Sequence, residues 1–267
     1  MEIPFTKCQA NGNDFILIYE ENIPDINITE TLIQKLCDRH IGIGADGIFI
    51  ISSSITNDFR LDYYNSDGSW ETFCANGSRC ASMYMYENRK ANQKMTFETG
   101  AGVYWAKVKD QKSIIMGMRK PEYKSDLIKP EGCPGFFVDS GARHFVCESD
   151  ILDCEYVIEL GRKIRYNQLF QPKGINVNFY KLQDNGCVEI RTYEKGVEQL
   201  MQSCSSGSTA VVFHLSQSLG LSSPITSKSP GGNLLFTFDN QWGDARCEGP
   251  VELLFSGVFN NIDSING

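Results

Sequence analysis

Two cysteines, Cys74 and Cys204, begin similar short sequences, Cys74-Ala-Asn-Gly and Cys204-Ser-Ser-Gly. Each follows an alternating apolar–polar segment and a polar turn, and each precedes a run of residues with helical spacing. The two cysteines are 130 positions apart (204 − 74). The pattern therefore predicts a supersecondary unit that occurs once in each half of the chain and places one cysteine at a helix N-terminus each time.

A helix N-terminus presents unpaired backbone N–H groups and a partial positive charge. Both favour the thiolate form of a cysteine, and the same N–H groups can bind a carboxylate. Two such thiols on opposite faces of one amino acid could move a proton across its Cα, one acting as base and the other as acid. The bound carboxylate would help to offset the negative charge that develops at Cα. This chemistry requires no cofactor in principle.

A cysteine in a folded protein is more often a small buried apolar residue than a catalytic group. On their own, His144 would be interpreted as a structural histidine, and Glu194 beside Lys195 as a surface ion pair. The paired context separates Cys74 and Cys204 from the other eight cysteines, which we interpret as core or surface residues. These are Cys8, Cys37, Cys80, Cys133, Cys147, Cys154, Cys187 and Cys247.

The composition limits the class of protein. The 267 residues have a net charge of −8, with 41% hydrophobic and 22% charged residues, and the length predicts about two domains. Such a chain is neither disordered nor collagen-like, and its acidity argues against nucleic-acid binding. No apolar run reaches the ~20 residues that span a bilayer, and the first residues lack a signal-peptide pattern. We therefore expect a cytoplasmic protein with free thiols, a small-molecule partner and no membrane partner.

A metal site is not expected, because the chain has three histidines and no Cys-x-x-Cys pair. Periodicity predicts the elements that must position the two cysteines. Helices are expected over 29–39, 78–89 and 207–219. Strands are expected over 59–63, 103–108, 114–118, 177–182, 188–192, 234–238 and 251–255. Many short strands with a few helices predict an α+β fold. Three prolines within 119–135 predict a linker there.

Several segments resemble, in the same order along the chain, those of the diaminopimelate epimerase family. The segment Cys74-Ala-Asn-Gly-Ser-Arg-Cys80, preceded by Tyr64-Asn-Ser-Asp-Gly68, is similar to the family's first active-site sequence. The other matching segments are 5–15, 36–47, 174–179, 191–196, 230–232 and 249–250. The resemblance implies two pseudo-symmetric domains, each a strand-rich, barrel-like sheet around a central helix, with the active site in the cleft. It also implies domains of residues 1–119 plus 257–267 and 120–256.

The resemblance further implies an epimerase of LL- and meso-diaminopimelate that works without pyridoxal phosphate, and it makes a homodimer plausible. Cys74 and Cys204 match the two acid/base positions, and His144 matches a histidine held near the thiols. Residues matching substrate-binding positions are Asn13, Asn65, Ala75, Asn76, Asn176, Glu194, Lys195, Ser205 and Ser206. Glu194 matches a residue that supports catalysis as well.

The chain departs from the family pattern at positions that bear on specificity. Gly141-Ala-Arg-His144 stands where relatives often read Gly-Asn-Pro-His, and Arg143 is a possible new carboxylate contact or a solvent-facing residue. Lys195 replaces an arginine, so a point charge replaces a bidentate fork. The stretch 198–203 before the second cysteine is one residue longer than its family counterpart.

These departures leave alternatives open. The nearest is a racemase of another amino acid, such as glutamate, on the same scaffold. A dehydratase or isomerase of the same fold is a second, although such relatives commonly lack one thiol. A non-catalytic binding or redox-sensing protein with reactive cysteines is a third. A substrate panel would separate these classes.

Overall fold

The computed structural model describes residues 2–23 and 27–260. The chain divides into two compact units, Met1–Met116 with Pro250–Gly267, and Gly117–Gly249. Residue 1 and residues 261–267, which the sequence assigned to the first domain, lie outside the described residues. None of the helices within the described ranges is long and apolar enough to cross a membrane.

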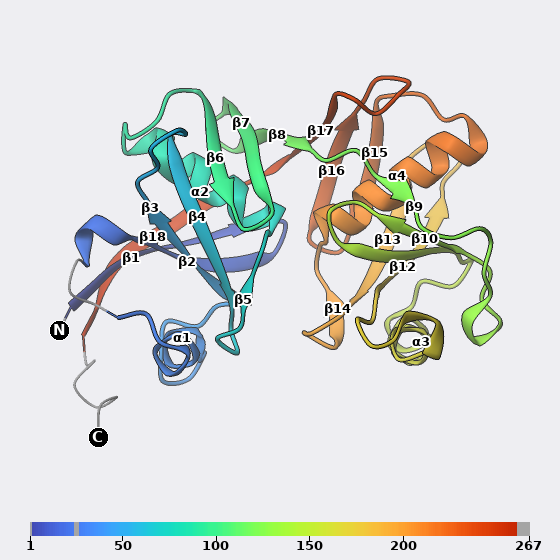
Figure 1. Cartoon of the computed structure of the whole chain (residues 1–267), viewed down its shortest axis with the longest axis horizontal. Helices are drawn as coiled ribbons and strands as arrows, with labels where there is room; N and C mark the ends of the chain where they lie inside the picture. The colour runs from blue at the N-terminus through green and yellow to red at the C-terminus, as the bar shows by residue number, and fades with distance from the viewer. Residues whose placement is uncertain (1, 24–26, 261–267) are drawn as a thin grey trace. The chain divides into compact units, whose positions relative to one another are not determined.

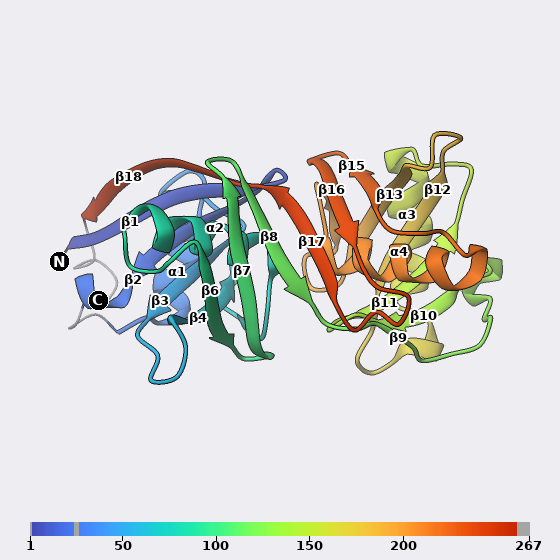
Figure 2. The ribbon, with the colours of Figure 1, turned by 90° about the horizontal axis from the view of Figure 1, so that it is seen from above.

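The first unit is a sheet wrapped around one helix (Figures 1 and 2). Its strands pair antiparallel from β1 to β2, parallel from β2 to β3, and antiparallel from β3 to β4. A second parallel step joins β4 to β6, and β7 and β8 follow antiparallel. In chain order the elements are β1 Glu2–Ala10, β2 Asn13–Tyr19, η1 Glu20–Asn22, α1 Glu30–Cys37, β3 Gly47–Ser52, β4 Phe59–Asn65, β5 Trp70–Glu71, α2 Ala75–Glu87, β6 Lys94–Thr99, β7 Gly102–Asp110, β8 Ser113–Met118 and β18 Glu252–Asn260.

The second unit repeats this order. Its pairings run antiparallel from β10 to β11, parallel to β12, antiparallel to β13, parallel to β15, and antiparallel through β16 and β17. The elements are β9 Glu122–Tyr123, η2 Pro130–Gly132, β10 Phe136–Asp139, β11 Arg143–Glu148, α3 Cys154–Arg165, η3 Gln168–Phe170, β12 Asn176–Leu182, β13 Val188–Glu194, β14 Gln199–Met201, α4 Ser205–Leu219, β15 Ile225–Ser229, β16 Gly232–Thr237 and β17 Ala245–Pro250. The repeated unit and the α+β class predicted from the sequence are confirmed.

The pairing of residues between strands shows which positions of the two units are equivalent. Phe15 pairs with Gly47 in the first unit as His144 pairs with Asn176 in the second, and Phe49 pairs with Tyr63 as Asn178 pairs with Thr192. The separations 144 − 15, 178 − 49 and 192 − 63 are each 129. The two cysteines are 130 apart, so the second unit gains one residue between β13 and α4.

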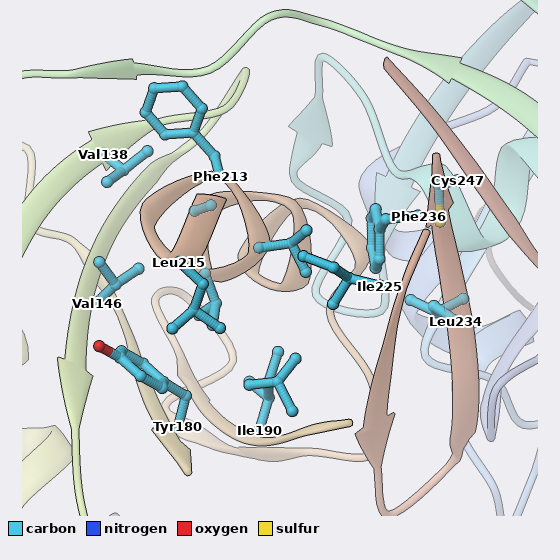
Figure 3. Close-up of a cluster of buried hydrophobic side chains, with 14 of the residues drawn as sticks. Val138, Val146, Tyr180, Ile190, Phe213, Leu215, Ile225, Leu234, Phe236 and Cys247 are labelled. Atoms are coloured by element: carbon cyan, nitrogen blue, oxygen red, sulfur yellow. The ribbon is translucent and has the colours of Figure 1, made fainter. Parts of the chain in front are cut away.

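Each unit encloses the helix that follows its cysteine. Helix α4 is surrounded by side chains from the strands of its own unit, including Val146, Ile190 and Phe236 (Figure 3). Helix α2 packs against β1, β2, β3, β7 and β18. Small residues at the start of each helix permit this close packing. A Cβ on Gly77 would lie 1.8 Å from the Phe49 ring, and one on Gly207 would lie 2.2 Å from Asn178 Oδ1.

The outer helices α1 and α3 are amphipathic, and α3 was not predicted. The sequence assigned no element to residues 154–165, although this stretch includes Arg162, Lys163 and Arg165. Asp153 caps α3 by accepting a hydrogen bond from the Tyr156 N–H (2.9 Å). These three basic residues form its last turn, where positive charge favours the helix dipole. A capping aspartate before buried Val157 and Ile164 was the available signal.

The other predicted helices and strands are confirmed, with ends that shift by a few residues. The predicted linker 119–135 lies inside the second unit: β9 pairs with β10, and the Tyr123 hydroxyl hydrogen-bonds His214 Nδ1 (2.8 Å). The structure divides the chain at 116/117 and 249/250 rather than at 119/120 and 256/257. The second difference arises because β18 already pairs with β1 from Glu252 onward.

We predict that Gly77→Ala destabilises the protein by about 1–3 kcal/mol, because the new methyl group overlaps Phe49 and outweighs the better helix propensity of alanine. Chemical denaturation of both proteins measures the difference. Gly243→Ala is the control, since its Cβ would meet nothing closer than 3.4 Å in an exposed loop. Equal stability of Gly77→Ala and the wild type would contradict the close contact.

Candidate active site

Both cysteines occupy the N-cap positions of the enclosed helices, as predicted. Cys74 precedes α2 with φ −140° and ψ 115°, and Cys204 precedes α4 with φ −130° and ψ 103°. Both thiols are partly exposed. The residues after each cysteine, Ala75 and Ser205, begin the helical turn whose N–H groups have no intrahelical acceptor. Each cysteine therefore lies beside a set of donors suited to a thiolate or a carboxylate.

The Cys204 sulfur has one backbone donor and one hydroxyl neighbour within its own unit. The Gly207 N–H points to Cys204 Sγ at 3.4 Å, and the Ser206 hydroxyl lies 3.5 Å from it. Hydrogen bonds to the charged form of an acid stabilise that form. The first turn of α4 is thus arranged to stabilise a thiolate at Cys204.

His144 reaches this group through Ser206. Its ring is fully buried, with Nε2 3.0 Å from Ser206 Oγ and Nδ1 3.0 Å from Asn178 Nδ2. Burial lowers the pKa of His144 to about 3. The imidazole is therefore neutral at physiological pH, and its Nε2 contacts Ser206 Oγ.

In the first unit, a buried amide chain reaches from strand β2 to helix α2. Asn76 Nδ2 donates to Asn13 Oδ1 (3.2 Å), and Asn13 Nδ2 donates to Asp46 Oδ2 (2.6 Å). The fully buried Arg79 donates to Asn76 Oδ1 and Asn11 Oδ1, both at 2.8 Å. These hydrogen bonds fix Asn13 and Asn76, two residues that the sequence analysis predicted for the site. Their other partners are Asp46 and Arg79, which the sequence analysis did not identify.

Beneath Asn13 lies a charged cluster of Lys7, Asp14, Arg39 and Asp46. Lys7 and Arg39 both pair with Asp14, and Arg39 also pairs with Asp46 (2.8 Å). Burial raises the pKa of Asp14, but hydrogen bonds from Arg39 and Lys7 outweigh burial and lower that pKa to about 2. Burial, aided by the charge of Asp14, raises the pKa of Asp46 although Asn13 donates to it. Asp14 thus remains ionised and balances the two cations.

Two further predicted residues lie at strand ends. Asn65 closes β4, where its Oδ1 accepts from the Tyr63 hydroxyl (2.7 Å) and its Nδ2 donates to Ser69 Oγ (3.1 Å). Asn176 opens β12, and its Oδ1 accepts from the Lys195 backbone N–H (2.8 Å). Asn176 is therefore brought directly against Lys195.

The extra residue lies in the β13–β14 turn. Glu194 pairs with Gln199 across this turn, and Glu198 has φ +56°. Glu198 Oε1 accepts from the Gly196 N–H (3.0 Å) and from Arg165 Nε (3.1 Å). The turn that carries Glu194 and Lys195 is therefore tied to α3, a contact that the sequence did not predict.

Arg143 does not extend into solvent alone. Its guanidinium stacks 4.7 Å from the centre of the Phe137 ring, and its Nε donates to the Gly174 carbonyl (2.9 Å). Phe137 packs against the buried cluster that includes Val157 and Ile164 of α3. The Arg143 side chain therefore lies with the residues that pack toward α3. The neighbouring His144 contacts α4 through Ser206. Arg143 and His144 therefore face opposite sides of β11.

In the first unit the structure joins the predicted residues Asn13 and Asn76 by a hydrogen bond. In the second unit it joins Cys204, Ser206 and His144 through hydrogen bonds, and Asn176 to Lys195. Asn178 and Thr192 were missed, although a polar residue at 178 inside an apolar strand was a usable signal. Over residues 2–23 and 27–260, no group of three His, Cys, Asp or Glu side chains is arranged to hold a metal ion.

A family model and relatives of nearly equal length identify one family. A family model described as diaminopimelate epimerase matches residues 5–124. The diaminopimelate epimerase of Aquifex aeolicus (strain VF5) is 35% identical over 269 residues, covering 95% of this chain and 96% of that protein. That of Hydrogenobaculum sp. (strain Y04AAS1) is 38% identical over 275 residues, covering 96% and 98%. The crystal structure of a hydroxyproline epimerase from Agrobacterium vitis shares the fold, with TM-score 0.76, 12% identity and coverage of 96% and 92%.

We predict that Asp14→Asn lowers the free energy of unfolding by about 2–4 kcal/mol at pH 7, because it leaves the buried Lys7 ammonium without its carboxylate. The folded pKa of Asp14 is about 2, below the ordinary aspartate value of 3.8. Its stabilising effect is therefore complete above about pH 4 and is lost as the pH falls through 2. Urea unfolding at pH 7, 5, 4 and 3 should show the difference from wild type shrinking only below pH 4. Asp150→Asn, at a highly exposed carboxylate (96%), is the control.

Proposed function

The chain belongs to the diaminopimelate epimerase family, and from this premise we propose that it interconverts LL- and meso-diaminopimelate without a cofactor. Two findings together support the proposal. The similarity to the family extends over almost the whole chain, and a cysteine occupies the N-cap of each enclosed helix. The reaction would serve lysine and peptidoglycan precursor synthesis. We place the enzyme in the cytoplasm, where free thiols persist.

The proposed reaction is a two-base proton transfer at Cα. The thiolate of one cysteine, Cys74 or Cys204, removes the α-hydrogen as a proton and becomes a thiol. The opposite thiol then delivers its proton to the other face of the carbanion and becomes the thiolate. Charge and proton count balance, and the enzyme returns to a state that accepts the product epimer. The mechanism requires both sulfurs to reach one Cα.

Backbone donors support the developing charge. We assign the α-carboxylate to the N–H groups that follow the cysteines, from Ala75 and Asn76 in α2 and from Ser205 and Ser206 in α4. As negative charge moves from Cα onto this carboxylate, fixed dipoles stabilise it without reorganising. These donors belong to the backbone, so they do not depend on which side chains stand at Ser205 and Ser206.

Side chains at strand ends would bind the rest of the substrate. Asn13, Asn65 and Asn176 each offer an amide. The Oδ1 of Asn176 already accepts from the Lys195 backbone N–H, so we assign its Nδ2 to a substrate acceptor. Glu194 would accept from a substrate ammonium, and the Lys195 ammonium would pair with a carboxylate. Because Lys195 is a point charge, it imposes less orientation than an arginine would.

The altered segment before His144 motivates a second candidate. Ala142 carries no polar group, and the Arg143 guanidinium is held by Phe137 and Gly174. We propose Arg143 as a substrate-carboxylate contact that replaces a missing amide. An enzyme with this exchange could prefer another amino acid, such as glutamate. Both substrates use the same two thiols, so the substrate rather than the reaction type separates the two candidates.

Proton NMR in D2O under reducing conditions tests the function. LL-diaminopimelate, glutamate and a panel of single amino acids are incubated separately with the enzyme. Loss of the α-proton signal and appearance of the meso isomer, with diaminopimelate alone, are expected. Exchange with glutamate instead would transfer the same chemistry to the second candidate. No exchange with any amino acid would overturn both.

In this assay we predict that Cys74→Ala and Cys204→Ala each reduce epimerisation at least about 100-fold, since each removes one of two acid/base groups. Cys154→Ala is the matched control, because Cys154 is an exposed thiol at the start of α3. It should retain the wild-type rate. Wild-type epimerisation by either of the first two variants would exclude the two-thiol mechanism.

We also propose that the protein is a homodimer. Strand β18 exposes Leu254 (44%) and Val258 (48%), two apolar side chains that suit an interface between copies. We predict that Leu254→Lys with Val258→Lys converts a dimer into a monomer in light-scattering measurements of mass. Ile55→Lys, at a fully exposed residue, should leave the mass unchanged. A wild-type monomer at all concentrations would contradict the proposal.

A further inference from the structure

A continuous chain of hydrogen bonds leads from the interior of the second unit to Cys204. Thr192 Oγ1 lies 2.9 Å from Asn178 Oδ1, and Asn178 Nδ2 lies 3.0 Å from His144 Nδ1. His144 Nε2 lies 3.0 Å from Ser206 Oγ, which lies 3.5 Å from Cys204 Sγ. Thr192, Asn178 and His144 are buried, and they come from β13, β12 and β11.

The partners of Asn178 fix the direction of this chain. Its Nδ2 is also 3.2 Å from the Phe145 carbonyl oxygen, which can only accept a hydrogen bond. The atom at that position must therefore be the amide nitrogen, and the opposite atom, Oδ1, accepts from the Thr192 hydroxyl. Because Nδ2 only donates, His144 Nδ1 has to accept.

The proton of the neutral His144 ring then lies on Nε2. Nε2–H donates to Ser206 Oγ, and this acceptor position is thereby filled. The single hydroxyl proton of Ser206 is left to point elsewhere, and Cys204 Sγ is the acceptor within reach. The order of donation is therefore Thr192 to Asn178, Asn178 to His144, His144 to Ser206, and Ser206 to sulfur.

The equivalent positions of the first unit show that the fold does not need this polarity. The counterparts of His144, Asn178 and Thr192, each 129 positions earlier, are Phe15, Phe49 and Tyr63. The centres of these three rings lie 4.7–6.2 Å apart, in two edge-on pairs and one stacked pair. Phe49 fills the space beside Gly77 that Asn178 fills beside Gly207. One unit is thus closed by aromatic packing where the other buries a polar chain that costs desolvation.

We infer that Asn178 and Thr192 are positioning residues that hold His144 in its Nε2–H tautomer and so direct the Ser206 hydroxyl proton to the Cys204 thiolate. The inference rests on the proposed role of Cys204 as an acid/base group. It assigns His144 no proton transfer of its own. The buried imidazole acts as a fixed donor whose direction Asn178 determines.

Removing the Asn178 donor should reverse the chain. Without it, nothing reserves Nδ1 as an acceptor, so the ring proton can move to Nδ1. Nε2 then becomes an acceptor and draws the Ser206 hydroxyl proton away from the sulfur. The thiolate keeps the Gly207 N–H and loses the O–H donor, and the Cys204 thiol becomes a weaker acid.

The surrounding charges remain constant in this comparison. In the hydrogen-bonded series from Thr192 to Cys204, the titratable groups are His144 and Cys204 itself. The charged residues nearest to Thr192 along β13 are Arg191, which pairs with Glu189, and Glu194 with Lys195 beyond the strand end. None of these is altered by the substitutions below.

Nitrogen NMR of the three histidines tests the tautomer in the free wild-type protein. His144 is assigned by its loss in His144→Gln, and we expect its Nε2 protonated and its Nδ1 unprotonated. In Asn178→Leu, a variant of similar size, we expect the proton to shift toward Nδ1. A wild-type His144 that carries its proton on Nδ1 overturns the inference, whether or not any variant folds.

The thiol is followed by the pH dependence of iodoacetamide alkylation, read at the Cys204 peptide by mass spectrometry without substrate. Asn178→Leu should slow alkylation of Cys204 at neutral pH about tenfold, which corresponds to a rise of about one pH unit in its titration midpoint. Thr192→Val, which removes only the outer hydroxyl, should give a smaller shift in the same direction. Alkylation of the exposed Cys154 in the same sample should not change.

A double-mutant cycle separates this route from a general loss of structure. Ser206→Ala removes the last donor and should slow Cys204 alkylation as Asn178→Leu does. In the Ser206→Ala background, Asn178→Leu should have no further effect, because its action passes through Ser206. Additive effects, or an Asn178→Leu variant with wild-type alkylation, overturn the inference. These readouts use neither diaminopimelate nor turnover, so they can fail while epimerisation stands, and the reverse.

Discussion

The close approach of a strand to the first turn of each enclosed helix is the constraint on which the site depends. Gly77 and Gly207 lack the Cβ atoms that would collide with Phe49 and Asn178. The helix N-terminus, with its unpaired N–H groups, can therefore lie directly against the ends of the strands that carry the candidate binding residues. A bulkier first turn would separate the cysteine from those residues and leave the donors without a bound carboxylate.

Within this shared frame the two units place their cysteines in chemically different surroundings. In the first unit, aromatic rings at Phe15, Phe49 and Tyr63 fill the space under the helix start. In the second, the same space holds the amide and imidazole that lead to Ser206 and Cys204. A two-base epimerase needs one thiolate and one thiol in each resting state. The Ser206 hydroxyl proton, directed as we infer, would favour the thiolate form at Cys204.

Local sequence signals account for three of the helices, for some of the strands and for the positions of both cysteines. Alternation predicted β4 and β13, and helical spacing with a small-residue start predicted α2 and α4. Contacts between distant segments could not be read in this way. Asn178 reads locally as a polar interruption of a strand, and its function appears only when β11, β12 and β13 lie side by side. Arg79 is similar, because an arginine inside a helix gives no sign of its contacts with Asn11 and Asn76.

The additional residue before Cys204 illustrates how the repeat tolerates change. Glu194 stands 129 positions after Asn65, whereas Cys204 stands 130 after Cys74, so the insertion is confined to the turn and strand between them. Glu198 adopts a left-handed backbone conformation, and its carboxylate holds both the Gly196 N–H and Arg165. The strand end and the helix start are each fixed by their own packing, so the length difference is absorbed where no register is imposed. Glu194 and Cys204 therefore keep the positions that Asn65 and Cys74 have in the first unit.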